Sequence, residues 1–190
     1  ALGGVQFISF ENGTQPEALP VQLGTFVLGD SREPKDTKGI LARVKNGAQH
    51  GLRIMGKSIH ALSDQEIDAF AEQLSAEQKK ILRAQIIDRH ITQVAKALMG
   101  AEPFDHDQLG HLLTKHQEQL RDGLGISTHK IDRMIDAAMA AGAQGAKING
   151  SGGGGCMFAY APKNAEKVAE AIARAGGKAY VIRVDEGVKV

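Results

Sequence analysis

Short runs of β-branched and aromatic residues occur near both ends of the chain, and turn-forming residues separate them. Such runs are typical of strands, which we predict over residues 5–10, 25–30, 145–149, 156–161 and 178–184. A turn-rich segment at 11–16 follows the first run. We therefore expect the strands at 5–10 and 25–30 to pair as antiparallel neighbours.

Apolar residues at helical spacing occupy the middle of the chain. A stripe over 87–98 ends at Gly100, and similar stripes cover 109–120 and 131–138. Capping boxes that begin at Ser63 and Ser75 each predict the start of a helix. Two more helices are predicted: one follows Asp36 and Thr37 and carries Ile40, Leu41 and Val44, and one covers 165–175, with Asn164 as its cap and Gly176 and Gly177 as its end.

This order of elements predicts an α+β fold, in which helices pack on one face of a mainly antiparallel sheet. We expect one domain over residues 1–190. Within it, residues 1–35 hold a strand pair, 36–122 are mainly helical, and 123–190 form an α/β segment around a glycine-rich loop.

Composition narrows the classes of function. The chain has 190 residues, 42% of them hydrophobic, which is enough for a sizeable core. Its 23 basic and 22 acidic residues give a net charge of +1, so neither nucleic acid nor an anionic membrane is an expected partner. The single Cys156 has no internal disulfide partner, and no stretch resembles a signal peptide or a membrane span, so we expect a cytoplasmic protein. The start at Ala1 suggests a fragment.

A glycine cluster lies between the strands predicted at 145–149 and 156–161. Gly150, Ser151, Gly152, Gly153, Gly154 and Gly155 allow positive φ angles and a close approach of another group to the backbone. Successive N–H groups in such a turn can bind anionic oxygens. A tight hairpin without a ligand is the alternative, and glycine content alone does not decide between the two.

Residues 112–162 resemble the C-terminal signature of the GHMP kinases, the family of galactokinase, homoserine kinase, mevalonate kinase and phosphomevalonate kinase. Three segments match in order: LLTKHQEQL at 112–120, GISTHKID at 125–132 and GAKINGSGGGGC at 145–156. The third is similar to the family motif G-A-K-(L/I)-T-G-(A/G)-G-G-G-G-C, with Asn149 in place of Thr and Ser151 in place of Ala or Gly. Further upstream, 26–38 and 1–4 resemble other parts of the family.

The resemblance implies a ferredoxin-like C-terminal domain with a helical insertion, and ATP and Mg²⁺ as cofactors. It places residues 150–155 on the phosphate side of the cleft and Asp30, Ser31 and Asn149 near the substrate. The family's phosphate-binding loop and catalytic Asp are expected upstream of this chain, in a missing N-terminal domain. No catalytic residue or metal ligand is therefore assigned here, and the chain alone is expected to be inactive.

Several residues have structural alternatives. Lys147 either aims its ammonium at phosphates, or it only faces solvent or pairs with a carboxylate. His106, His111 and His116 are five residues apart, about 140° around a helix, and so are not expected to share a metal. Asp30 and Ser31 either contact substrate or form a turn at a strand end, and Cys156 is expected to be a small buried residue with an ordinary thiol.

The resemblance implies transfer of the γ-phosphate of ATP to a hydroxyl of a small alcohol or sugar. A galactokinase-like sugar kinase is the first expectation, based on 116–122. Residues 34–38 and the GGGGC ending instead favour a mevalonate kinase-like enzyme. The third alternative is a catalytically inactive relative that acts as a sensor or binding module. A homodimer is a further possible assembly.

Overall fold

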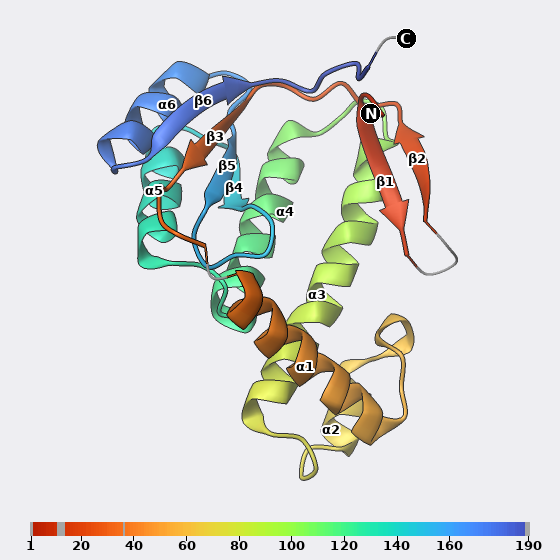
Figure 1. Ribbon diagram of the computed structural model, residues 1–190. Helices are drawn as coiled ribbons and strands as arrows, with labels where there is room; N and C mark the ends of the chain where they lie inside the picture. Colours follow the sequence, from red (N-terminus) through yellow and green to blue (C-terminus); the bar gives the residue numbers. More distant parts are fainter. Residues whose placement is uncertain (1, 11–13, 36, 189–190) are drawn as a thin grey trace.

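The computed structural model describes residues 2–10, 14–35 and 37–188, which form a sheet with covering helices, a hairpin and a helical lobe (Figure 1). The strands are β1 (Val5–Ser9), β2 (Gln15–Leu19), β3 (Phe26–Asp30), β4 (Gly145–Ile148), β5 (Cys156–Tyr160) and β6 (Lys178–Ile182). The α-helices are α1 (Thr37–Met55), α2 (Asp64–Ala69), α3 (Ala76–Met99), α4 (His106–Glu118), α5 (His129–Ala140) and α6 (Ala165–Arg174). A 3₁₀ turn, η1 (Ile59–Ala61), precedes α2, and a π-helical turn, η2 (Gln119–Gly123), follows α4.

Four antiparallel strands in the order β4-β5-β3-β6 form the main sheet. Helices α5 and α6 pack against one face, where Val27 and Ala159 are fully buried. Gly29 on β3 leaves room for these helices, because a Cβ there would lie 2.9 Å from the side chains of both Ile172 and Met134. The α+β class with an antiparallel sheet is thus confirmed.

Helices α3 and α4 contact the sheet through a second hydrophobic cluster. Tyr160 is fully buried in a cluster with Leu109 and Leu112 of α4, and Phe26 packs against the same cluster. The axis of α4 runs close to the edge strand β4, because a Cβ on Gly145 would lie 2.1 Å from the carbonyl oxygen of Gly110. This close approach fixes the position of β4 and of the loop that follows it.

The helical lobe is built by α1, α2 and the first half of α3, and both predicted capping boxes are confirmed there. The Ser63 side chain accepts the N–H of Glu66, and the Glu66 carboxylate accepts the N–H of Ser63. Ser75 and Gln78 form the same reciprocal pair at the start of α3, which ends at Gly100 as predicted.

The predicted pairing of strands 5–10 and 25–30 is wrong. β1 pairs with β2 in a separate two-stranded ribbon, and β3 instead lies between β5 and β6. β2 was hard to predict, because its residues QPEAL include none of the β-branched or aromatic side chains that favour strands. Residues 1, 11–13 and 36, which include part of the predicted turn and half of the predicted α1 cap, lie outside the described part of the chain.

Of the two predicted ends of α6, one needs a smaller change. Asn164 precedes α6 as expected, but its side chain makes no capping hydrogen bond. Gly176 follows α6 with a φ of +92°, as expected for a glycine that ends a helix.

Among the residues that the structure describes, no helix is long and apolar enough to span a membrane.

Candidate functional site

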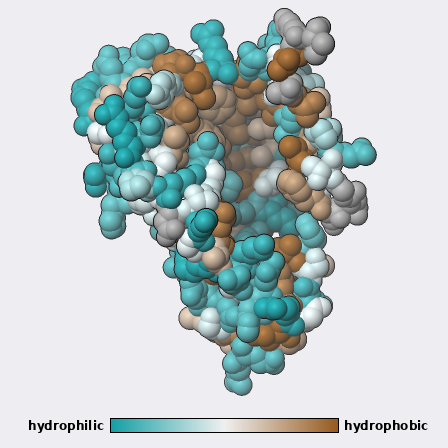
Figure 2. All heavy atoms as spheres, viewed as in Figure 1, coloured by the Kyte–Doolittle hydropathy of each residue, from teal (hydrophilic) through white to brown (hydrophobic). Residues whose placement is uncertain are grey.

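The glycine loop, defined here as residues 149–155, connects β4 to β5 beside the start of α1 (Figure 1). On the same side of the molecule, Figure 2 shows a hollow with a largely hydrophobic wall, between the main sheet and the β1–β2 hairpin. Phe26 and Phe158, whose rings meet edge to face at 5.8 Å, alternate along their strands with the residues buried under α5 and α6. They therefore lie on the opposite face of the sheet.

Left-handed backbone dominates the glycine loop. φ is +75° at Gly150, and it is +79°, +73°, +106° and +78° at Gly152, Gly153, Gly154 and Gly155. L-residues with a Cβ rarely adopt these values, so the run of glycines is a conformational requirement. A two-residue hairpin turn needs at most two such residues, which makes this loop more specialised than a plain hairpin connection.

Two neighbouring segments hold the glycine loop from opposite sides. The N–H of Gly153 donates to the carbonyl oxygen of Ile126 at 2.8 Å, and a Cβ on Gly152 would lie only 2.4 Å from that oxygen. On the other side, a Cβ on Gly154 would lie 2.9 Å from the carbonyl oxygen of Pro34. The loop is seated directly on the backbone at both contacts.

A side-chain hydrogen bond joins these two supporting segments to each other. The hydroxyl of Thr128 donates to the Glu33 carboxylate at 2.6 Å. The same hydroxyl accepts the N–H of Ile131 and so caps α5. The beginning of α5, the segment after β3 and the glycine loop thus form one connected unit.

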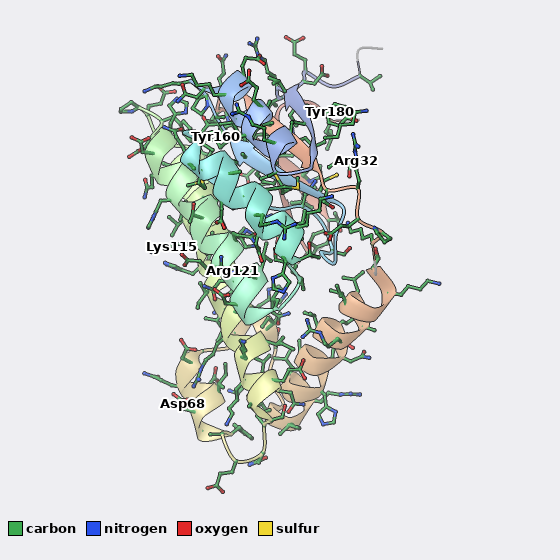
Figure 3. All side chains as sticks on the ribbon, turned by 90° about the vertical axis from the view of Figure 1, so that its left-hand side faces the viewer. Arg32, Asp68, Lys115, Arg121, Tyr160 and Tyr180 are labelled. Atoms are coloured by element: carbon green, nitrogen blue, oxygen red, sulfur yellow. The ribbon has the colours of Figure 1, made fainter. Side chains whose placement is uncertain are left out.

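Asp30 and Ser31, which the sequence placed near the substrate, make local turn contacts after β3. The Asp30 carboxylate accepts the N–H of Arg32 at 2.8 Å, and the Ser31 hydroxyl accepts the N–H of Glu33 at 3.2 Å. Ser31 is fully buried, whereas Arg32 is exposed at the surface (Figure 3) and has a φ of +58°. The strand-end turn is therefore present, and a substrate contact by either residue stays a prediction.

Asn149 and Cys156 close the loop at its base. The N–H of Asn149 donates to the carbonyl oxygen of Cys156 at 2.8 Å, and the Asn149 side chain is exposed. Burial, and then the nearby carboxylate of Asp30, raise the pKa of the Cys156 thiol. The expected burial of Cys156 is only partial, and its ordinary reactivity stays a prediction, with which the raised pKa agrees.

A cation that the sequence analysis did not single out lies against the loop. The ammonium of Lys35 is 3.2 Å from the position that a Cβ of Gly150 would take, and its side-chain stem crosses Gly155. Within the described part of the chain, the N–H groups of Gly152, Gly154 and Gly155 donate to no acceptor. An ammonium beside unused backbone donors suits an anion such as a phosphate group.

Lys147 belongs to a different cluster, together with Asp88 of α3 and His116 of α4. Its ammonium donates to the carbonyl oxygen of Ile148 and lies 5.1 Å from the centre of the Phe158 ring. Burial lowers the pKa of Lys147 to about 8 and raises that of Asp88 to about 7. The structure thus favours the alternative in which Lys147 faces a carboxylate.

The third member, His116, lies between charged neighbours without a close hydrogen bond. Its Nε2 is 3.7 Å from Oδ1 of Asp88, and that buried oxygen has no hydrogen-bond partner among the described residues. Burial, and then the charge of Lys147, lower the pKa of His116 to about 4. The imidazole is therefore neutral at pH 7.

The other two histidines of α4 lie elsewhere. His106, the first residue of the helix, contacts the hydroxyl of Tyr160 through Nδ1 and stacks on its ring, while His111 is exposed. Figure 3 shows Tyr160 at the sheet end of the molecule and Lys115 on the outer side of α4. Over residues 2–10, 14–35 and 37–188, no group of three or more His, Cys, Asp or Glu side chains is placed to hold a metal ion.

Gln117 is a second residue near the loop that sequence reasoning missed. It is only 3% exposed, and its carbonyl accepts the N–H of Ile148 at 2.8 Å. Its amide nitrogen donates to Ser127 at 3.1 Å and to Asp132 at 3.4 Å. One signal was available: Gln117 is a polar residue four positions after Leu113, on the otherwise apolar stripe of its helix.

Comparison with known proteins gives matches in one family. Residues 92–178 match the family model described as GHMP kinases C terminal. A mevalonate kinase from Thermococcus gammatolerans is 33% identical over 191 residues, which cover 100% of this chain and 49% of that protein. A galactokinase from Mycobacterium bovis is 30% identical over 122 residues, which cover 62% of this chain and 32% of that protein.

The fold comparison agrees with these matches. The crystal structure of Lactococcus lactis galactokinase complexed with galactose has a TM-score of 0.76 and 19% sequence identity, covering 93% of this chain and 49% of that one. At this identity the likeness concerns the fold alone. The chain spans about half the length of the mevalonate kinase that it matches from end to end. The resemblance found in the sequence is confirmed.

Proposed function

This chain carries the C-terminal domain of the GHMP kinases, and on this premise we propose that it supplies one half of an ATP-dependent kinase for a small-molecule hydroxyl group. The observation that carries the proposal is the glycine loop, with four successive left-handed glycines between two backbone supports. Its unused N–H groups and the Lys35 ammonium offer donors to phosphate oxygens.

Phosphoryl transfer depends on positioning and on stabilising charge at the oxygens of the transferred group. ATP would supply the phosphoryl group. In this chain, Gly152, Gly154 and Gly155 would direct N–H groups at phosphate oxygens, and Lys35 would add a positive charge beside them. Lacking a Cβ, the glycines would also let the phosphates approach the backbone closely.

The remaining catalytic parts are proposed to lie outside this chain. Among the described residues, no group of three or more His, Cys, Asp or Glu side chains is placed to hold a metal ion, and we assign no Mg²⁺ ligand within this chain. The general base, expected to be an Asp, and the second phosphate-binding loop would belong to an N-terminal domain. A cytoplasmic location, a homodimer and the substrate contacts of Asp30, Ser31 and Asn149 are part of the same proposal.

For the acceptor we propose mevalonate, ahead of the sugar that the sequence analysis favoured. The supporting observation is that the match to a mevalonate kinase extends over the whole chain, including the helical lobe. The match to a galactokinase covers a smaller share of the chain and keeps a galactose-type sugar as the second candidate.

The test is an assay of ADP release by the complete gene product with ATP and Mg²⁺, with mevalonate or galactose as acceptor. Turnover with mevalonate alone is the expected result, and turnover with galactose alone would replace the first acceptor by the second. If neither acceptor is phosphorylated while ATP still binds, the kinase proposal fails and the binding-module alternative replaces it. A blank without acceptor corrects for ATP hydrolysis.

A further inference from the structure

The carboxamide of Gln117 connects three parts of the chain that are separate in sequence. It comes from the last turn of α4, and it reaches the edge strand β4 through Ile148 and the start of α5 through Ser127 and Asp132. Ser127 in turn donates to Asp132 at 2.6 Å. The carbonyl and the amide nitrogen of one buried side chain are thus both used.

Two paths lead from this carboxamide to the glycine loop. Ile148, which Gln117 holds through its N–H, is the last residue of β4 and comes directly before the loop. Ser127 follows Ile126, whose carbonyl oxygen accepts the N–H of Gly153 at 2.8 Å. Gln117 is therefore linked both to the strand that leads into the loop and to the backbone on which the loop rests.

The chemistry of this position is demanding. The side chain must accept from an N–H group and donate to a hydroxyl and a carboxylate at the same time, which a primary carboxamide does. A methionine of similar length would leave the buried N–H of Ile148 unpaired. A glutamate would accept that N–H but, when ionised, would place a second negative charge beside Asp132.

We propose that Gln117 is a positioning residue, which holds the glycine loop where its N–H groups meet the phosphates of the nucleotide. This inference rests on the proposed function and extends it to a residue that touches neither substrate. Loss of the carboxamide should affect nucleotide binding more than the affinity for the acceptor, because the residues that Gln117 bonds lead into the loop or adjoin its backbone support.

The experiment compares Gln117→Met and Gln117→Glu with wild type in the complete gene product. Arg89→Met is the matched control, because Arg89 also donates two side-chain hydrogen bonds, both part-buried, but to the carbonyl oxygens of Ile59 and Leu62, away from the glycine loop. At a temperature where circular dichroism shows all four proteins folded, Gln117→Met should raise the KM for ATP about tenfold and change the acceptor KM little. Arg89→Met should lower stability and leave both KM values unchanged.

Two further readouts distinguish positioning from general stability. Hydrogen exchange of a peptide over 146–157 should be faster in Gln117→Met than in Arg89→Met. In Gln117→Glu, the KM for ATP should fall as pH is lowered from 8 to 6, because a protonated carboxyl can again donate to Asp132. Wild type and Gln117→Met should not show this additional pH dependence.

The possible failures are separable. If wild type shows no ATP-dependent turnover, the proposed function fails. If wild type turns over and Gln117→Met keeps the wild-type KM for ATP, the positioning role alone is overturned. An equal rise in KM for Arg89→Met would also overturn it, since any loss of stability would then have the same effect.

Discussion

Replacement of Gly152 by alanine tests whether the glycine loop is seated on the backbone of Ile126. An added Cβ would lie 2.4 Å from the carbonyl oxygen of Ile126 and 2.6 Å from its Cβ, at a φ of +79°. Both contacts are about 1 Å too short for non-bonded atoms. The loop would have to move, and the 2.8 Å hydrogen bond from Gly153 to the same oxygen would be lost.

A second glycine separates backbone strain from this contact. Gly56 has a similar φ of +61°, but a Cβ there would meet nothing within 4 Å. Gly56→Ala should therefore cost only the left-handed backbone penalty, about 1–2 kcal/mol. Gly152→Ala adds about 1–3 kcal/mol for overpacking and about 1 kcal/mol for the hydrogen bond, so its total should be about 3–6 kcal/mol.

Urea denaturation followed by circular dichroism measures the difference between the two variants. We expect Gly152→Ala to be less stable than Gly56→Ala by about 2–4 kcal/mol, with similar m-values. The complete gene product should also lose ATP-dependent turnover in Gly152→Ala and keep it in Gly56→Ala. Equal stability of the two variants would refute the reasoning, because the contact with Ile126 would then cost nothing.

Two further predictions concern the groups around the loop. Because burial raises the native pKa of Asp88 from 3.8 to about 7, its carboxylate should cost more stability as pH rises through this window, so the stability that Asp88→Asn gains over wild type should grow with pH. Urea denaturation at pH 5 and pH 8 checks the sign, and a stability gain in Asp88→Asn that is no larger at pH 8 would contradict it. Thr128→Val should lower the stability by about 1 kcal/mol, because it removes the cap of α5 and the hydrogen bond to Glu33. Thermal unfolding compares it with Thr92→Val, which changes an exposed threonine of α3. Equal melting temperatures of the two variants would show that the cap does not stabilise the protein.

The helices were predictable because their signals are local. Ile131, Met134, Ile135 and Ala138 are all buried on α5, as their spacing indicated, and the two capping boxes form within four residues of sequence. Strand pairing depends on partners far away in the chain. β3 takes β5 and β6 as neighbours because the backbone N–H and C=O groups along both edges of a central strand need partners, and no local pattern in 25–30 says which strands supply them.

The site was predictable to a similar extent. The run of glycines correctly indicated positive φ angles in the loop. What the sequence did not reveal were the groups that surround it, Lys35 and Gln117. Gln117 meets the backbone N–H of Ile148, 31 residues away, and a backbone group leaves no mark in the residue types. For Lys147, the sequence left several partners open, and only the packing of β4 against α4, which in turn contacts α3, brought it near Asp88.

The three segments that carried the resemblance, 112–120, 125–132 and 145–156, meet in one hydrogen-bonded unit. Gln117 comes from the first, Ser127 and Asp132 from the second, and Ile148 and Gly153 from the third. Without the other two, each segment would contain a buried polar group that has no hydrogen-bond partner, which lowers the stability of the fold by about 1–3 kcal/mol. Their occurrence together in this chain therefore has a physical cause, because the buried polar groups of each segment find their hydrogen-bond partners in another.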